Sequence, residues 1–287
     1  MRRILILLSF IAAPIISAAA KEQAYWAFQP LTPVKVPTEE ANPWARNAID
    51  HFILENARKR QLSPNASATR NSLIRRAYFD LIGLAPSRKE VEEFTADSSP
   101  GAYHQLVSEL LSSPHYGERW GRHWLDVARF GESHGYESDN ERPTAWTYRD
   151  AVIRALNEDM PFDRFTQWQV AGDSLKGDDA LAQALTGFLT AGSTVTNVDG
   201  IDREKAMYDK MDDIVSATGS AFLGLTIGCA RCHDHKYDPI SQRDYYRLVG
   251  FFLPGKPTDR NVAIGDKGGT VKALTWNGGN TRKNPLL

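Results

Sequence analysis

The segment TRNSLIRRAYFDLI, residues 69–82, repeats its apolar residues at helical spacing. They recur three or four positions apart, which is the period of one face of an α-helix. These residues are Leu73, Ile74, Ala77, Tyr78 and Leu81. Gly83 then ends the pattern, as glycine often does after a helix. The segment predicts an amphipathic helix that stops at Gly83.

Helical signals continue on both sides of this segment. Upstream, Asn42 and Pro43 are suited to the N-cap and first turn of a helix whose apolar face holds Ile49, Phe52 and Ile53. Downstream, Ser87 and Glu90 form a capping-box pattern. Further helices are expected from about 99 to 111, around Trp120, Trp124 and Val127, at 145–158, 161–170, 178–190 and 202–222, and after Ser241 with Asp244.

Alternation of apolar and polar residues, the mark of a half-buried strand, is hard to find. We therefore expect a mainly α fold: an irregular multi-helix domain with long polar loops and an extended, Pro-rich N-terminal arm. The expected divisions are a signal peptide at 1–20, the arm at 21–43, a helical domain at 44–253, and a linker or truncated end at 254–287. Residues 131–143 (GESHGYESDNERP) are polar and turn-rich, so we expect a loop there.

The N-terminus has the layout of a secretory signal peptide. Arg2 and Arg3 precede an apolar run from Ile4 to Ile16, and Ala18 and Ala20 fit a small-residue cleavage site. The run is shorter than the 20 or so residues that span a bilayer. We expect an exported protein, periplasmic or secreted, with no transmembrane span beyond this peptide. The formal net charge of −1 lacks the basic excess of a nucleic-acid-binding protein.

The chain has two cysteines, and both belong to Cys229-Ala230-Arg231-Cys232-His233. C-x-x-C-H is the attachment pattern of c-type haem. Two thiols one helical turn apart reach the two vinyl groups of one porphyrin, and the histidine that follows serves as the proximal iron ligand. The alternatives are a Cys229–Cys232 disulfide or thiol redox pair, or another metal. A redox motif of thioredoxin type would need a βαβ pattern, and structural zinc usually takes four ligands.

No methionine follows the motif, so a distal iron ligand would come from upstream. Met207 and Met211 lie four apart on one face of an expected helix and are the candidates, although both also suit a hydrophobic core. Five-coordinate iron is the alternative. Asp234 and His235 directly follow the motif and are candidates to support His233 or the haem propionates, with a solvated surface as the alternative reading.

A second polar cluster lies at residues 118–142. His123 and Asp126 share a helix face, and His134 lies on the following loop. Such a group is a candidate catalytic site for acid–base or metal-dependent chemistry. The alternative is a network of arginine–carboxylate pairs around a tryptophan-rich core.

Several long motifs carry a family resemblance. They are RWGRHWLDVAR (119–129), RPTAW (142–146), PFDRF (161–165) and LGLTIGCARCHDHKYDP (223–239). With them, residues 25–253 resemble the planctomycete cytochrome-associated family, the domain of unknown function numbered 1549. The resemblance implies an exported protein whose c-type haem motif is Cys229, Cys232 and His233. Members are commonly longer, often with a second conserved domain, so this chain is expected to be part of a longer protein.

These observations favour an exported protein that carries one covalent haem c and transfers electrons, with redox proteins or a C-terminal companion domain as partners. The first alternative is a periplasmic metal- or haem-dependent enzyme, with hydrolysis as one candidate reaction, that uses His123, Asp126, His134 or the pair of Asp234 and His235. The second is a structural module with a Cys229–Cys232 disulfide. The sequence indicates no electron donor, electron acceptor or substrate.

Overall fold

The computed structural model describes residues 26–37, 43–135, 139–195, 202–264 and 267–275. The chain divides into two units, residues 1–66 and 67–287. The expected signal peptide at 1–20 lies outside the described residues. Of the expected arm at 21–43, the described part up to residue 37 is a short 3-10 turn, Trp26–Phe28, followed by chain that is exposed to residue 35 and half-buried at 36 and 37. The arm as a whole stays a prediction.

The described part of the first unit contains one α-helix, α1 (Ala48–Lys59). It begins five residues later than we predicted, since Pro43 lies in a turn instead of the first helical turn. Asn47 is the N-cap: its side chain accepts from the Asp50 N–H, while the Asp50 carboxylate accepts from the Asn47 N–H. This reciprocal capping box satisfies two helix-end donors and fixes the start. Asn42 lies outside the described residues.

The second unit begins with three helices that share a small core. They are α2 (Arg70–Leu81), α3 (Arg88–Ala96) and α4 (Ala102–Leu111). The predicted apolar face of α2 is confirmed for Ile74, Ala77 and Tyr78, which are buried with Phe94 of α3. Ser87 caps α3 through the predicted capping box with Glu90.

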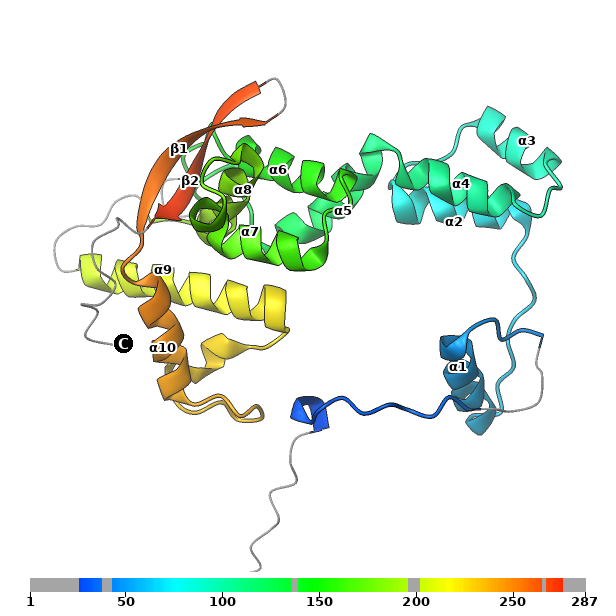
Figure 1. The fold of residues 1–287 in the computed structure, drawn as a ribbon, viewed down its shortest axis with the longest axis horizontal. Coiled ribbons are helices and arrows are strands. Elements are labelled where there is room, and N and C mark those ends of the chain that lie inside the picture. The colour runs from blue at the N-terminus through cyan, green and yellow to red at the C-terminus, as the bar shows by residue number, and fades with distance from the viewer. Residues whose placement is uncertain (1–25, 38–42, 136–138, 196–201, 265–266, 276–287) are drawn as a thin grey trace, which may run out of the picture. The chain divides into compact units, whose positions relative to one another are not determined.

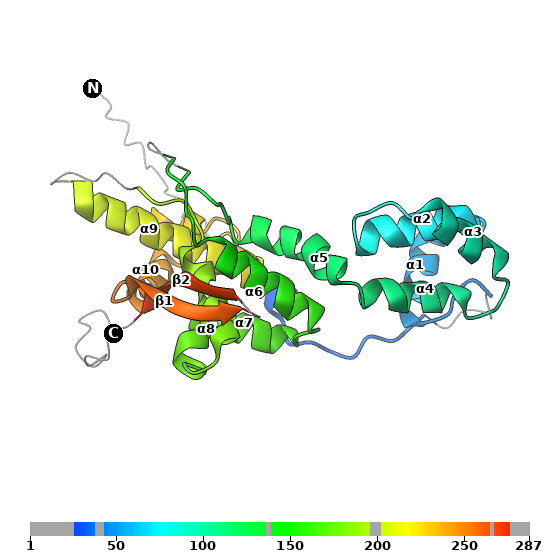
Figure 2. The same ribbon diagram turned by 90° about the horizontal axis from the view of Figure 1, so that it is seen from above.

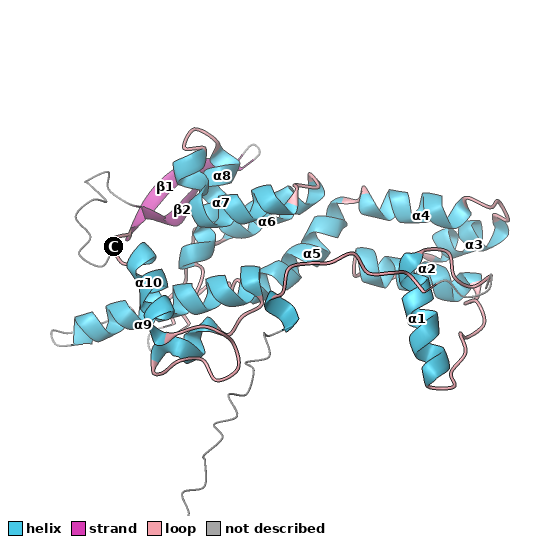
Figure 3. Cartoon of the chain, turned by 60° about the horizontal axis from the view of Figure 1, so that its bottom comes forward, coloured by secondary structure: helices cyan, strands magenta, loops and turns pink. Residues whose placement is uncertain are grey.

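The larger core is enclosed by the remaining helices. These are α5 (Pro114–Val127), α6 (Trp146–Asn157), α7 (Phe162–Leu175), α8 (Ala180–Leu185), α9 (Asp202–Thr218) and α10 (Gln242–Phe252). Helix α8 continues as a 3-10 helix, η2 (Thr186–Thr190), and α9 continues as a π-helical turn, η3 (Gly219–Leu223). The prediction of a mainly α fold is confirmed (Figure 3).

The core is centred on aromatic residues from several helices. Trp124 packs edge-on against Phe165 at 4.7 Å between ring centroids and lies 5.9 Å from Phe188. Its indole N–H donates to the Tyr148 hydroxyl, which donates in turn to the buried Gln169 side chain. Burial raises the pKa of the Tyr148 hydroxyl well above its ordinary value. Trp124 therefore packs against the core with its indole N–H paired, whereas Trp120 of the same segment is 42% exposed.

A β-hairpin closes the larger core where we expected a linker. Strands β1 (Lys256–Ile264) and β2 (Lys267–Thr275) pair antiparallel, with Lys256 opposite Thr275 (Figure 1). The hairpin lies against α8, α6 and η2 (Figure 2). Val262, Val271 and Leu274 are buried in the core. The prediction of a linker was wrong for residues 256–275, because Gly, Lys and Asn on the outer face obscured the apolar residues that face inward.

Candidate functional site: the Cys229–His233 turn

The cysteine motif lies on a 3-10 turn, η4 (Ile227–Arg231), between α9 and α10. A 3-10 helix has three residues per turn, so side chains three positions apart lie above one another. The turn therefore has three faces. The first is formed by Ile227 and Ala230, which are both buried in the larger core. This face anchors the turn to the protein.

The second face turns toward α9. Gly228 lies so close to this helix that an added Cβ would be 2.4 Å from the Ser216 hydroxyl oxygen. Three positions on, the Arg231 guanidinium donates to Asp212 and Asp209 of α9, each at 3.0 Å. Its hydrogen bond to Asp209 is the largest cause of a raised Arg231 pKa. The sequence analysis did not identify Arg231 as the residue that holds the motif turn against α9. The spacing of Asp209 and Asp212, which places both carboxylates on one helix face, was the sequence signal for a cationic partner.

The third face carries the cysteines. Cys229 and Cys232 are three positions apart, and both are exposed free thiols. The other two faces are held by burial and by ion pairs, so the thiol pair is presented on a fixed backbone. The motif residues that carry chemistry are thus the ones that the fold leaves accessible.

His233 is exposed and its tautomer follows from its hydrogen bond. Its Nδ1 lies 2.7 Å from the backbone carbonyl oxygen of Asp234. A carbonyl oxygen only accepts, so Nδ1 carries a proton; in the neutral imidazole Nε2 then has the lone pair. A histidine that ligates a metal through one nitrogen commonly donates from the other in this way.

Asp234 and His235 shape the loop that follows the motif. The Asp234 carboxylate accepts from the Gln242 N–H at the start of α10, at 2.8 Å. The His235 side chain is only 5% exposed. Its Nδ1 accepts from the Asp238 N–H at 2.8 Å, and its Nε2 lies 3.0 Å from the Thr226 hydroxyl. Asp234 therefore supports His233 through its backbone carbonyl, and the His235 imidazole is occupied within the loop.

The two candidate distal ligands have different environments. Met211 is 4% exposed and belongs to the larger core, beside Ile214 and Val215. Met207, one turn earlier on α9, is 40% exposed. Met211 is committed to packing, so Met207 is the more accessible of the two thioethers.

The second polar cluster is divided between two cavities. His123 and Asp126 line a cavity of about 600 Å³ along α5, together with Arg122 and Arg149. His134 lines a different cavity, of about 280 Å³, with Glu141 and Asp259. The Nδ1 atom of His134 is buried and has no hydrogen-bond partner among the described residues. The structure therefore does not assemble the three candidates into one site. The neighbouring Glu137 lies outside the described residues.

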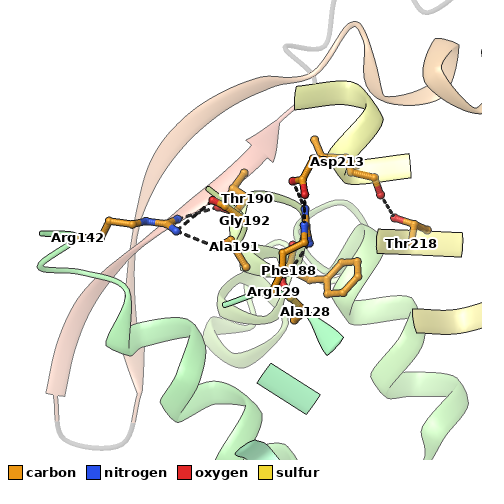
Figure 4. A network of polar contacts seen from close by, with 10 residues as sticks. Ala128, Arg129, Arg142, Phe188, Thr190, Ala191, Gly192, Asp213 and Thr218 are labelled. Carbon is orange, nitrogen blue, oxygen red and sulfur yellow. Dashed lines mark hydrogen bonds and ion pairs between the residues drawn. The ribbon is translucent and has the colours of Figure 1, made fainter. Parts of the chain in front are cut away.

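Two arginines from the same segment are structural (Figure 4). Arg129 makes a two-pronged ion pair with Asp213 of α9, at 2.6 and 2.7 Å. Arg142 donates to the backbone carbonyls of Thr190 and Ala191, at 2.7 and 2.8 Å. Burial lowers the pKa of Arg142. These contacts join the 131–143 loop and its flanks to η2 and α9, as the alternative of an arginine-based network predicted.

A family model described as a protein of unknown function, DUF1549, matches residues 48–256, most of the chain. The chain belongs to the PSCyt2 family. The match runs from α1 to the first residue of β1 and includes the motif turn. The predicted family is confirmed. No curated protein and no solved structure matches the chain.

The described part of this PSCyt2 chain has neither a metal-binding cluster of side chains nor a helix suited to span a membrane. No group of three or more His, Cys, Asp or Glu side chains there is arranged to hold a metal ion directly. No helix within those ranges is long and apolar enough to cross a membrane.

Proposed function

We propose that this PSCyt2 chain is an exported electron-transfer protein with one covalent haem c. Cys229 and Cys232 attach the porphyrin, and His233 ligates the iron. The observation that supports this most strongly is the arrangement of the motif turn. Two free thiols share its exposed face, and the adjacent His233 imidazole keeps an accessible Nε2 lone pair. The residues present therefore fit a c-type haem.

Attachment needs no external oxidant. Each thiol S–H adds across one vinyl C=C bond: the sulfur–carbon bond forms, the vinyl π bond is lost, and the hydrogen goes to the other vinyl carbon. The bound haem would supply a one-electron couple. The chain's own residues orient it: Arg231 fixes the turn against α9, and the Asp234 carbonyl holds the imidazole by its Nδ1–H. Redox proteins or a C-terminal companion domain are the proposed partners.

The test is expression with the predicted export signal in a host that attaches haem c outside the cytoplasm. We expect a c-type pyridine haemochrome spectrum that survives acid–acetone extraction. Changing both Cys229 and Cys232 to Ser removes the covalent haem. His233→Ala alters the iron spectrum, while His104→Ala, an exposed histidine on α4, leaves it unchanged. A colourless protein from a competent host, with intact mass two protons below the dithiol, would contradict the proposal and favour the disulfide module.

The cavity around His134 favours a second candidate function, a periplasmic hydrolytic enzyme that depends on a metal or on haem. The Nδ1 atom of His134 is buried without a hydrogen-bond partner among the described residues, so it is an available acid–base or ligand atom, and Glu141 and Asp259 line the same cavity. His134→Ala should abolish such an activity and keep the unfolding midpoint, whereas His115→Ala, on exposed α5 surface, should change neither. Destabilisation by His134→Ala without loss of activity would make His134 a structural residue.

A further inference from the structure

A cavity of about 750 Å³ lies between α9, α10 and the motif turn. Its walls combine cationic side chains with tyrosine rings. The main lining residues are Tyr208, Arg231, Arg243, Tyr245, Tyr246 and Arg247. A volume in this range is typical of sites for small organic ligands.

The charge on the cavity wall is positive. Arg243 and Arg247 are four positions apart on α10 and so share a helix face. Arg247 pairs with Asp244 at 3.1 Å, and Arg231 is held by carboxylates of α9. Arg243 has no ion-pair partner among the described residues, and in that part of the chain no Asp or Glu lines the cavity. The wall therefore offers a guanidinium for an anionic group.

The aromatic part of the wall is accessible and fixed. Tyr208 is 38% exposed and Tyr246 is 46% exposed, so each presents ring surface to the cavity. The Tyr246 hydroxyl donates to the Arg231 carbonyl oxygen at 3.2 Å, and its ring packs at 89° against the buried Tyr245 ring. Val249 adds apolar surface. A flat ring would stack on such a wall with little loss of side-chain freedom.

This cavity is separate from the face that carries the cysteines. Arg231 lines it, and Arg231 lies one position along the 3-10 turn from Cys232. One position on such a turn is a rotation of about 120°. Neither cysteine nor His233 lines the cavity. A ligand here would leave the thiol face accessible.

We infer that this cavity binds an aromatic anion, a ligand that joins a planar ring to a carboxylate or phosphate group. The ring stacks on Tyr208 and Tyr246, and the anionic group pairs with Arg243. Aromatic carboxylates and nucleotides share this chemistry. The inference does not depend on haem attachment.

The test is calorimetric titration of the full chain with 1-naphthoate and with adenosine monophosphate. Their uncharged counterparts, 1-naphthamide and adenosine, are the ligand controls. We expect an anion to bind about tenfold or more tightly than its neutral counterpart, because a charge-assisted contact is lost in the latter. Tighter binding of naphthoate identifies a carboxylate ligand, and tighter binding of the nucleotide identifies a phosphate ligand.

Single-residue variants test whether the anion binds in this cavity. Arg243→Gln should weaken binding of the anion about tenfold. Arg164 is an exposed arginine on α7, and Arg164→Gln should leave that affinity unchanged. Tyr246→Phe should retain binding and Tyr246→Ala should weaken it; Tyr208→Ala replaces the latter if it fails to fold. The variant with both cysteines changed to Ser should bind as the parent does, so failure of haem attachment cannot mimic failure here. No heat from either anion at millimolar concentration, or equal binding of charged and neutral probes, would overturn the inference.

Discussion

The two polar segments that the sequence singles out have opposite roles in the fold. In residues 118–142 the strongest contacts point inward, since Arg129 pairs with Asp213 and Arg142 donates to buried carbonyls. In the motif loop the charged residues also fix the backbone, but they leave Cys229, Cys232 and His233 exposed. The comparison teaches that charge alone does not mark a site. Accessible reactive atoms on a supported backbone are the more specific indication.

The largest effect on stability is expected from a variant that removes the ion pair between Arg129 and Asp213. Arg129→Gln removes the two-pronged pair and leaves Asp213 partly buried without its cation, so we expect a loss of about 3 kcal/mol in the free energy of unfolding. Urea denaturation measures it. Arg154→Gln, which breaks an exposed pair with Glu158, should cost less than about 1 kcal/mol. Equal costs for the two variants would remove the distinction between the segments.

A smaller effect is expected from Arg231→Gln in the motif loop. Its ion pairs with Asp209 and Asp212 are partly exposed, so we expect a cost of about 1–2 kcal/mol. Because this face supports the turn, amide hydrogen exchange at residues 228–232 should accelerate more than exchange in α6. Uniform acceleration across the second unit would mean that Arg231 supports the fold in general and not the turn.

The start of α10 provides a still smaller test. Ser241→Ala removes the hydroxyl that accepts from the Asp244 N–H, and we expect a loss of about 1 kcal/mol. Thermal unfolding measures it. Ser112→Ala, at the exposed end of α4, is the matched control and should change the midpoint less. An equal shift for the two variants would show that the capping box does not stabilise α10.

The smallest expected effect is a pH dependence of the motif loop. Hydrogen bonds from Lys205 and then Arg231 lower the pKa of the Asp209 carboxyl. A depressed folded-state pKa gives stability that is present above the unfolded-state pKa, about 4, and is lost as the pH falls through the folded value. The parent should therefore lose more stability below pH 4 than Asp209→Asn does. Parallel pH profiles in denaturant melts would show that this pair contributes nothing.

Elements of the fold that are set by local sequence signals were predictable, and elements that depend on long-range packing were not. Local signals sufficed where one helix face or one cap decides the structure, as at residues 70–81, Ser87 and Ser241. They failed for the start of α1, where Pro43 lies in a turn, because the competing capping box at Asn47 and Asp50 is equally local and sets the start of the helix. They also failed for the hairpin, whose strands gain their apolar burial from contact with α6, α8 and η2.

The candidate site was partly predictable for similar reasons. Cys229, Cys232 and His233 are adjacent in sequence, so their spacing alone identifies them. Arg231 takes its role from carboxylates 19 and 22 positions upstream, and the division of His123 from His134 depends on how α5 and the hairpin pack. The spacing of Asp209 and Asp212 marks a shared helix face, but the residue that pairs with this face is set by tertiary packing.

The hairpin has a practical consequence for dissecting the protein. The family match ends at residue 256, whereas Val262, Val271 and Leu274 beyond it fill the larger core. A chain cut at the edge of the match would uncover the surfaces of α6, α8 and η2 that the hairpin contacts, including Gly187, which lies against Val271. Exposed apolar surface of that kind favours aggregation. The boundary of the family match therefore stops one hairpin short of the residues that complete the larger core.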